Sequence, residues 1–543
     1  MQTSTTSLAF ALSALLVSMP AAAQHEDHSQ HQVAEPMSAA DQAQLGTVDF
    51  PISCAADAQP TFNRAVARLH SFWFPAAIEA FQEVLKADPH CGMAEWGIAM
   101  AHWGNPLGSN RPRPAVQAGW AASQRALELG ATTARERDYI AAIDHLYANH
   151  ETSDDLSRAR SYERAMERLV TTYPDDSEAA IFYAMALNGT ADLNDKTYAN
   201  QLKAAAILER EFAKQPNHPG IAHYIIHSYD VPPLAGRALD AAMAYAKIAP
   251  AAPHALHMPS HTFTRLGYWQ NSIDTNIRSA EAALEANSPA EALHAMDYMV
   301  YAYLQTGQDA AAQDVVQQMR EIGRQVDPQG GYGLAGFYAM AAIDARYALE
   351  RSDWAAAADL PTRRTVPFVD AISHFARAVG AARAGQPAEA RADLAMVARA
   401  RDALAAGSYW AQQIEIQRMA AEAWIELAEG NSARAIELMR AAADTEDGTE
   451  KSAISPGPIA PARELLGDML LELDRPAEAL VAYEATAAKE PGRFRGIYCA
   501  PTADERTGDD EKARLYYRQL VEICERADAD VRPELAQARR FVG

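Results

Sequence analysis

From residue 59 to residue 520 the chain repeats a spacing of small and large apolar residues that is typical of paired α-helices. In one clear copy, Ala77 is followed by Phe81, Val84 and Pro89. The small residue lets two helices approach, and the large residue fills the groove between them. Proline then ends the second helix, because it cannot continue the hydrogen-bond ladder. The pattern therefore predicts a series of helical hairpins.

The same spacing returns along the chain. Looser copies begin at Ala204 and Ala238, and a further clear copy runs from Gly467 through Tyr483 to Pro491. No alternation typical of strands competes with it, and neither a Gly-rich phosphate loop nor a His-Glu-x-x-His helix is present in the sequence. We therefore expect an all-α protein. At 543 residues the chain is too long for one ordinary core, which again favours a repeat array.

At these residues the chain resembles the tetratricopeptide repeat (TPR) family, whose unit is a helix–turn–helix of about 34 residues. The resemblance implies a right-handed α-solenoid of TPR-like helical hairpins, with a concave groove that binds an extended peptide or protein. The chain is also similar to exported bacterial TPR proteins of unestablished activity, which share HisAlaLeuHisMetProSerHis (254–261) and ProAlaArgGluLeuLeuGly (461–467). We expect an N-terminal array at 59–310 and a C-terminal array at 311–543.

Two His-x-x-x-His pairs stand out within the first array. His223 and His257 are 257 − 223 = 34 residues apart, and so are His227 and His261. An i, i+4 pair lies on one helix face, and neighbouring helices pack about 8–10 Å apart. Counting back from the turn at Gly267 directs both pairs into the groove, whereas counting from the preceding prolines turns them toward the packing face. We prefer the first register, in which four imidazoles converge.

The same register adds further candidate ligands. His294 and Asp297 fall on the groove side of the following helix, and His70 and His102 do so in the first two units. A neutral imidazole is a good ligand for copper, zinc, nickel and iron. Because no cysteine lies near these residues, the ligand set favours copper or zinc, with iron next.

Three functional hypotheses follow from these residues. In the first, the solenoid binds a transition metal for handling or for catalysis. In the second, the chain is a peptide- or protein-binding scaffold without metal, and the histidines are polar contacts in its groove. In the third, the chain is a copper-, iron- or zinc-dependent enzyme acting on a small molecule that the sequence does not specify. The sequence leaves open whether the protein is an enzyme.

The net charge and the N-terminal segment indicate which partners the protein binds and where it is located. The net charge of −23 argues against a nucleic-acid partner or an anionic membrane surface, since both attract basic proteins. The apolar run at 8–19 and the small residues after it predict a signal peptide at 1–23, too short to span a bilayer. A polar segment at 24–58 follows, with His25, His28 and His31 at its start. We expect an exported protein, periplasmic or secreted, without membrane insertion.

The four cysteines fit an oxidising compartment. Cys54 and Cys91 bracket the first unit, and Cys499 and Cys524 fall in the last. The end units of a solenoid lack one neighbour and fray, so a disulfide in each would hold it closed. We therefore expect the pairs Cys54–Cys91 and Cys499–Cys524, the alternative being four free buried thiols.

Overall fold

The computed structural model describes residues 45–108, 111–326, 333–363, 365–507, 510–529 and 532–543. Within these residues it contains α-helices, short 3-10 helices and no β-strand. The all-α prediction is confirmed. The expected signal peptide at 1–23 lies outside the described residues, as do His25, His28 and His31 of the polar segment.

The first part of the chain contains the elements up to the gap at 327–332. They are η1 (Ala56–Ala58), α2 (Gln59–His70), α3 (Phe74–Ala87), α4 (Gly92–Trp103), α5 (Arg113–Leu129), α6 (Ala134–Asp144), α7 (Asp155–Thr172), α8 (Ser177–Gly189), α9 (Ala199–Lys214), α10 (Pro219–Ser228), η2 (Ala235–Ala238), α11 (Leu239–Ile248), α12 (Pro253–His257), α13 (Pro259–Leu266), α14 (Trp269–Glu285), α15 (Pro289–Gln305), α16 (Asp309–Ile322) and η3 (Gly323–Gln325).

The second part continues with longer hairpins. Its elements are α17 (Gly333–Leu349), α18 (Trp354–Ala358), α19 (Pro367–Arg383), α20 (Pro387–Asp402), α21 (Tyr409–Ala428), α22 (Ser432–Asp447), α23 (Ala462–Glu472), α24 (Pro476–Lys489), α25 (Phe494–Thr507), α26 (Asp510–Ile523) and α27 (Pro533–Val542).

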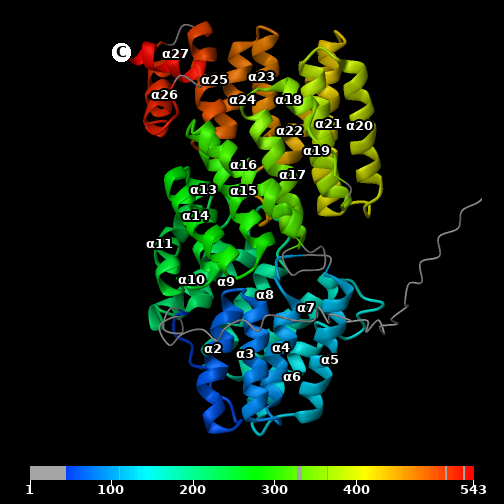
Figure 1. Ribbon diagram of the computed structural model, residues 1–543, viewed down its shortest axis with the longest axis vertical. Coiled ribbons are helices and arrows are strands. Elements are labelled where there is room, and N and C mark those ends of the chain that lie inside the picture. The colour runs from blue at the N-terminus through cyan, green and yellow to red at the C-terminus, as the bar shows by residue number, and fades with distance from the viewer. Residues whose placement is uncertain (1–44, 109–110, 327–332, 364, 508–509, 530–531) are drawn as a thin grey trace, which may run out of the picture.

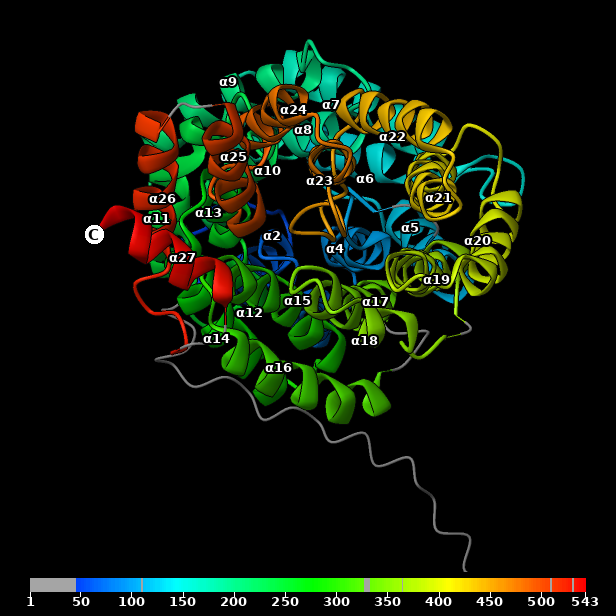
Figure 2. The ribbon, with the colours of Figure 1, turned by 90° about the horizontal axis from the view of Figure 1, so that it is seen from above.

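Consecutive helices pack against one another along the described chain, which makes the molecule an α-solenoid of helical hairpins. The N-terminal helices α2 to α6 lie at one end of the long axis and α25 to α27 at the other (Figure 1). Seen along that axis, the helices are arranged around a ring (Figure 2). The predicted boundary near residue 310 stays a prediction.

The small-and-large spacing does what the sequence predicts within the hairpins. A Cβ atom added to Gly97 on α4 would lie 2.3 Å from the ring of Phe81 on α3. In a late unit, a Cβ atom on Gly467 would lie 2.5 Å from the ring of Tyr483. In both places a glycine gives the neighbouring helix room for a buried aromatic ring, so the two helices approach closely.

The solenoid also contacts itself over long distances in sequence. Helix α2 packs against α10, and α15 packs against α25. Arg346 of α17 donates to the carbonyl oxygens of Gly457 and Pro458 at 2.8 and 2.7 Å, and to the carboxylate of Asp297 at 3.0 Å. These contacts fix the segment 449–461, which precedes α23, against α15.

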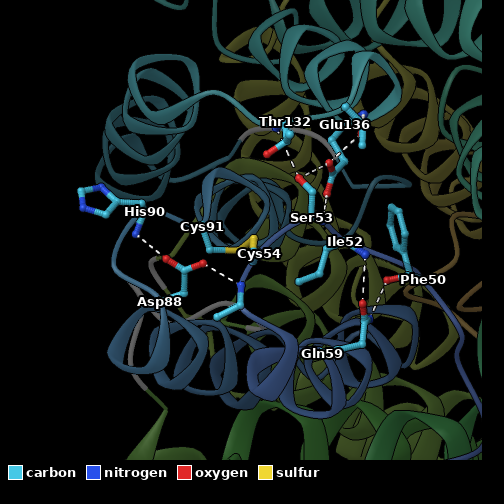
Figure 3. Close-up of a disulfide and its surroundings, with 12 residues drawn as sticks. Phe50, Ile52, Ser53, Cys54, Gln59, Asp88, His90, Cys91, Thr132 and Glu136 are labelled. Atoms are coloured by element: carbon cyan, nitrogen blue, oxygen red, sulfur yellow. Dashed lines mark hydrogen bonds between the residues drawn. A yellow bond between two sulfur atoms is a disulfide. The ribbon is translucent and has the colours of Figure 1, made fainter.

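The predicted disulfide at the N-terminal end is confirmed. Cys54 and Cys91 are bonded, and the bond ties the segment before α2 to the start of α4 (Figure 3). Neighbouring hydrogen bonds hold the same segment: Ala55 donates its backbone N–H to Asp88 at 2.8 Å, and Ser53 donates its own to Glu136 at 2.6 Å.

The second predicted disulfide, Cys499–Cys524, is wrong, because both thiols are free. Cys499 packs with the core around α23 and α24, whereas Cys524 lies 4.0 Å from the carbonyl oxygen of Gln305 at the end of α15. The last unit is not a fraying end. It is held against the middle of the chain, for example by the ion pair of Arg532 and Asp309 at 2.7 Å.

We expect the Cys54→Ser variant to unfold at lower denaturant than the wild type. The bond closes a separation of 37 residues, for which chain entropy predicts a loss of about 3–4 kcal/mol. Guanidinium unfolding monitored by circular dichroism measures the change, and Cys499→Ser is the control that removes a thiol without removing a disulfide. Equal stability of Cys54→Ser and the wild type would contradict this assignment.

Candidate metal centre

Six histidines from four helices gather in the interior, and none is more than 8% exposed. They are His223 and His227 on α10, His254 and His257 on α12, His261 on α13 and His294 on α15. Met258 interrupts the helix between His257 and His261, where the following Pro259 has no N–H to donate. The i, i+4 relation of this pair nevertheless survives the break.

The first triad consists of His223, His227 and His254. The Nε2 atom of His223 lies 3.1 Å from Nε2 of His227 and 3.2 Å from Nε2 of His254. One ring nitrogen from each of the three residues lies within 4.8 Å of the other two. Helix α10 therefore supplies two ligands and α12 supplies the third.

The second triad consists of His257, His261 and His294, and is built in the same way. The Nε2 atoms of His257 and His261 lie 3.1 Å apart, and a nitrogen of His294 lies within 4.8 Å of both. The rings of His257 and His294 are 4.4 Å apart between centroids. The arrangement of the first triad thus recurs one helical unit later.

The two triads adjoin each other. The ring centroids of His227 and His261 are 5.8 Å apart, and those of His254 and His257 are 5.9 Å apart. These pairs connect the triads from two sides, so the six rings form one continuous cluster.

For three of the six rings, a hydrogen bond at the far side determines which nitrogen carries the proton. Asn276 donates its amide N–H to the carbonyl oxygen of Ser272 at 2.7 Å, so its own oxygen faces His257. The Nδ1–H of His257 donates to that oxygen at 2.7 Å. The neutral ring carries one proton, and Nε2 of His257 is therefore a bare acceptor.

Two more rings carry their proton on Nδ1, at the far side of the ring, as His257 does. His261 donates its Nδ1–H to the carboxylate of Asp230 at 2.9 Å. His223 donates its Nδ1–H to the backbone carbonyl oxygen of His70 at 2.6 Å. An amide oxygen, a carboxylate and a backbone carbonyl therefore leave three Nε2 lone pairs turned inward, and partners of this kind orient metal-binding histidines.

The lone pairs of His257 and His261 consequently point at each other across 3.1 Å. Neither nitrogen has a proton to donate, so the contact is not a hydrogen bond. Two buried acceptors at this distance need a cation between them, either a proton or a metal ion.

Asp230 is itself held by two cations. Arg265 donates its Nε–H to one carboxylate oxygen at 2.9 Å, and Lys451 donates to the other at 2.9 Å. Burial alone would raise the pKa of Asp230, but Lys451, Arg265 and the hydrogen bond from His261 lower it well below its ordinary value. Asp230 is therefore ionised and keeps Nδ1 of His261 protonated.

Burial determines the charge state of the imidazoles. It lowers the pKa of His223 and that of His294 to about 3, and it lowers the pKa of each of the other four rings as well. Neighbouring imidazoles reinforce the lowering of the pKa in five of the six, and Lys451 and Arg265 do so for His261. At neutral pH all six rings are uncharged, which is the form that binds a metal ion.

A third buried group lies beside the first triad and contains Glu178 together with His70 and His218. Each ring donates its Nε2–H to a different oxygen of Glu178 at 2.9 Å, and the hydroxyl of Tyr224 donates to Nδ1 of His70 at 2.9 Å. Burial would raise the pKa of Glu178, but the two histidines lower it. Both Nε2 atoms donate hydrogen bonds to Glu178, so the group offers no bare Nε2 atom. It instead holds His70 in place, whose backbone carbonyl oxygen accepts from His223.

The structure therefore places the sequence candidates in different surroundings. His223, His227, His257, His261 and His294 meet in the cluster, and His70 supports it through its backbone. His102 is half-buried and belongs to none of the histidine groups found among the described residues. Asp297 faces Arg346 instead, and burial raises its pKa to about 6.

The sequence did not single out His254, Glu178 and His218 as part of the site. His254 lies near the start of α12, and His218 directly precedes α10. The spacing His254-x-x-His257 is the signal that marks the first of them, since i and i+3 share a helix face.

Comparisons with known proteins add little. No protein-family model matches the chain, and no curated protein matches it. The chain is similar to a solved structure described as the APC/C hetero-tetramer Cut9–Hcn1, at 10% sequence identity and a TM-score of 0.30. The match covers 89% of this chain and 96% of that chain. Within the described residues, no helix has both the length and the apolar character needed to cross a bilayer.

The metal-free protein is expected to lose stability as the pH falls from about 6.5 toward about 3. The unfolded chain protonates His294 below its ordinary pKa of 6.5, whereas the folded chain protonates it only near 3, so the unfolded state binds more protons in this window. Denaturant unfolding at about pH 7 and about pH 5 should show a smaller loss for His294→Gln than for the wild type. The exposed His90→Gln is the control, and an identical loss in all three proteins would refute this charge state.

Proposed function

We propose that this protein is an exported helical solenoid that binds transition-metal ions, copper or zinc, with one ion in each histidine triad. The observation that carries the proposal is the pair of bare Nε2 atoms held 3.1 Å apart in the second triad. Their protons are committed to Asn276 and Asp230 on the far sides of the rings.

The spacing fits a metal ion. Metal–nitrogen bonds of about 2.0–2.1 Å at tetrahedral angles separate two ligand nitrogens by roughly 3.3 Å. The Nε2 separations of 3.1 and 3.2 Å in the two triads are close to that value. The ligands are all nitrogen, which suits copper and zinc better than magnesium, calcium or manganese.

Three protein ligands leave a coordination position open on each ion. Structural zinc sites have four protein ligands, whereas catalytic sites have three and bind water or substrate in the fourth position. The triads are of the second kind, which supports a role in metal-dependent chemistry. Burial of all six rings speaks against the histidines serving as polar contacts for a peptide in the groove.

Export is the part of the proposal that rests on the N-terminus and on the cysteines. The apolar run at 8–19 is of signal-peptide type. The Cys54–Cys91 disulfide is typical of proteins that fold in an oxidising compartment. A periplasmic or secreted location would bring the site into contact with metal ions outside the cytoplasm.

The untagged protein, purified from the exported fraction and analysed by elemental mass spectrometry, should contain about one metal ion per triad. Its N-terminus should lie near residue 24. The variant His227→Ala should lose the ion of the first triad, His261→Ala that of the second, and the double variant both, because each removes one of three ligands. His102→Ala is the matched control and should keep both ions. A folded wild type that binds neither copper nor zinc on addition would refute the proposal.

A further inference from the structure

We propose that the two triads form a single dinuclear copper centre that takes up dioxygen between its ions. This inference rests on the proposed function and deepens it, because it names the metal, its oxidation state and the class of small molecule that the site binds. Three features of the cluster carry it: the contact between the triads, the charge of their surroundings and their burial.

The contact between the triads makes the two ions neighbours. His254 and His257 are three residues apart on α12, yet they belong to different triads, and their ring centroids are 5.9 Å apart. On the other side, His227 and His261 meet edge to face at 5.8 Å. The two triads are therefore adjacent, which is what a two-metal site that binds one ligand between its ions requires.

The charge of the surroundings favours copper in its monovalent form. All six ligands are neutral imidazoles, and no carboxylate lies among the ligand atoms of either triad. The nearest carboxylate, Asp230, is already paired with Arg265 and Lys451. Two divalent ions would place four positive charges in this buried site, whereas two Cu(I) ions place two, and buried charge without a partner is costly.

Uptake of dioxygen leaves the total charge of the two-copper site unchanged. Each Cu(I) gives one electron to dioxygen, so that two Cu(II) ions form and dioxygen becomes peroxide with two negative charges. Four positive and two negative charges again sum to two positive charges, and the step needs no proton. Dioxygen is neutral and accepts two electrons, and each Cu(I) ion gives one. The two Cu(I) ions can therefore reduce it without raising the net charge of the buried site.

Burial limits the ligand to a small one. The six rings are at most 8% exposed, and the side chain of Tyr298 covers the second triad with its hydroxyl 3.3 Å from Nε2 of His261. That hydroxyl donates to the backbone carbonyl oxygen of Ser455 at 3.1 Å, which holds the ring in place. A diatomic molecule fits these constraints better than a larger substrate does.

The test uses the full exported chain, loaded with Cu(I) without oxygen and then exposed to dioxygen. We expect one dioxygen to be consumed for every two copper ions. The two Cu(II) ions should then share a bridging ligand, so that their spins couple and the electron paramagnetic resonance signal is absent. The variant His294→Gln, which lacks one ligand of the second triad, should instead give a resonance from isolated Cu(II) in the first triad. His102→Gln should behave like the wild type.

Two outcomes would overturn the inference. A resonance that accounts for two uncoupled Cu(II) ions per chain would show that the triads bind copper independently, and the proposed metal binding would survive. Retention of Cu(I) without oxygen consumption would also refute the inference while leaving metal binding intact. A protein that binds no copper or zinc at all would refute the proposed function itself.

Discussion

The histidine cluster depends on one contact, in which two imidazole nitrogens without protons are held 3.1 Å apart in the interior. Such a contact is unfavourable unless a cation lies between the nitrogens, because both are buried acceptors and neither can donate to the other. The fold maintains it by occupying the opposite nitrogen of each ring. Asn276 does this for His257 and Asp230 does it for His261. The arrangement is therefore built into the packing of α14 and of the segment after α10 against the pair.

Parts of the chain that are far apart in sequence maintain this geometry. Lys451 lies 221 residues after Asp230 and donates to it, and the same segment supplies the carbonyl oxygen of Ser455 to Tyr298. Arg346 fixes that segment through Gly457 and Pro458. The C-terminal hairpins thus complete the centre that the N-terminal hairpins begin.

The repeat spacing was enough to predict the hairpins and most of the cluster. The 34-residue offset identified His223, His227, His257 and His261, because equivalent positions in stacked units are neighbours in space. The ring partners were harder to predict. Asp230 lies in the segment after α10 and reaches His261 in the next unit, and the backbone of His70 reaches His223 across 153 residues of sequence. Asp297 shows a further limit: Arg346 from another unit takes the carboxylate that the sequence offered as a ligand. The pairing of Cys499 with Cys524 failed because the last unit packs against α15.

The most direct test of the central claim is anomalous diffraction from crystals of the copper-loaded protein at the copper absorption edge. The account predicts two anomalous peaks, one in each triad, each about 2.0–2.1 Å from three imidazole nitrogens. Rings turned away from one another, with copper absent from both triads or bound only among His70, Glu178 and His218, would contradict it.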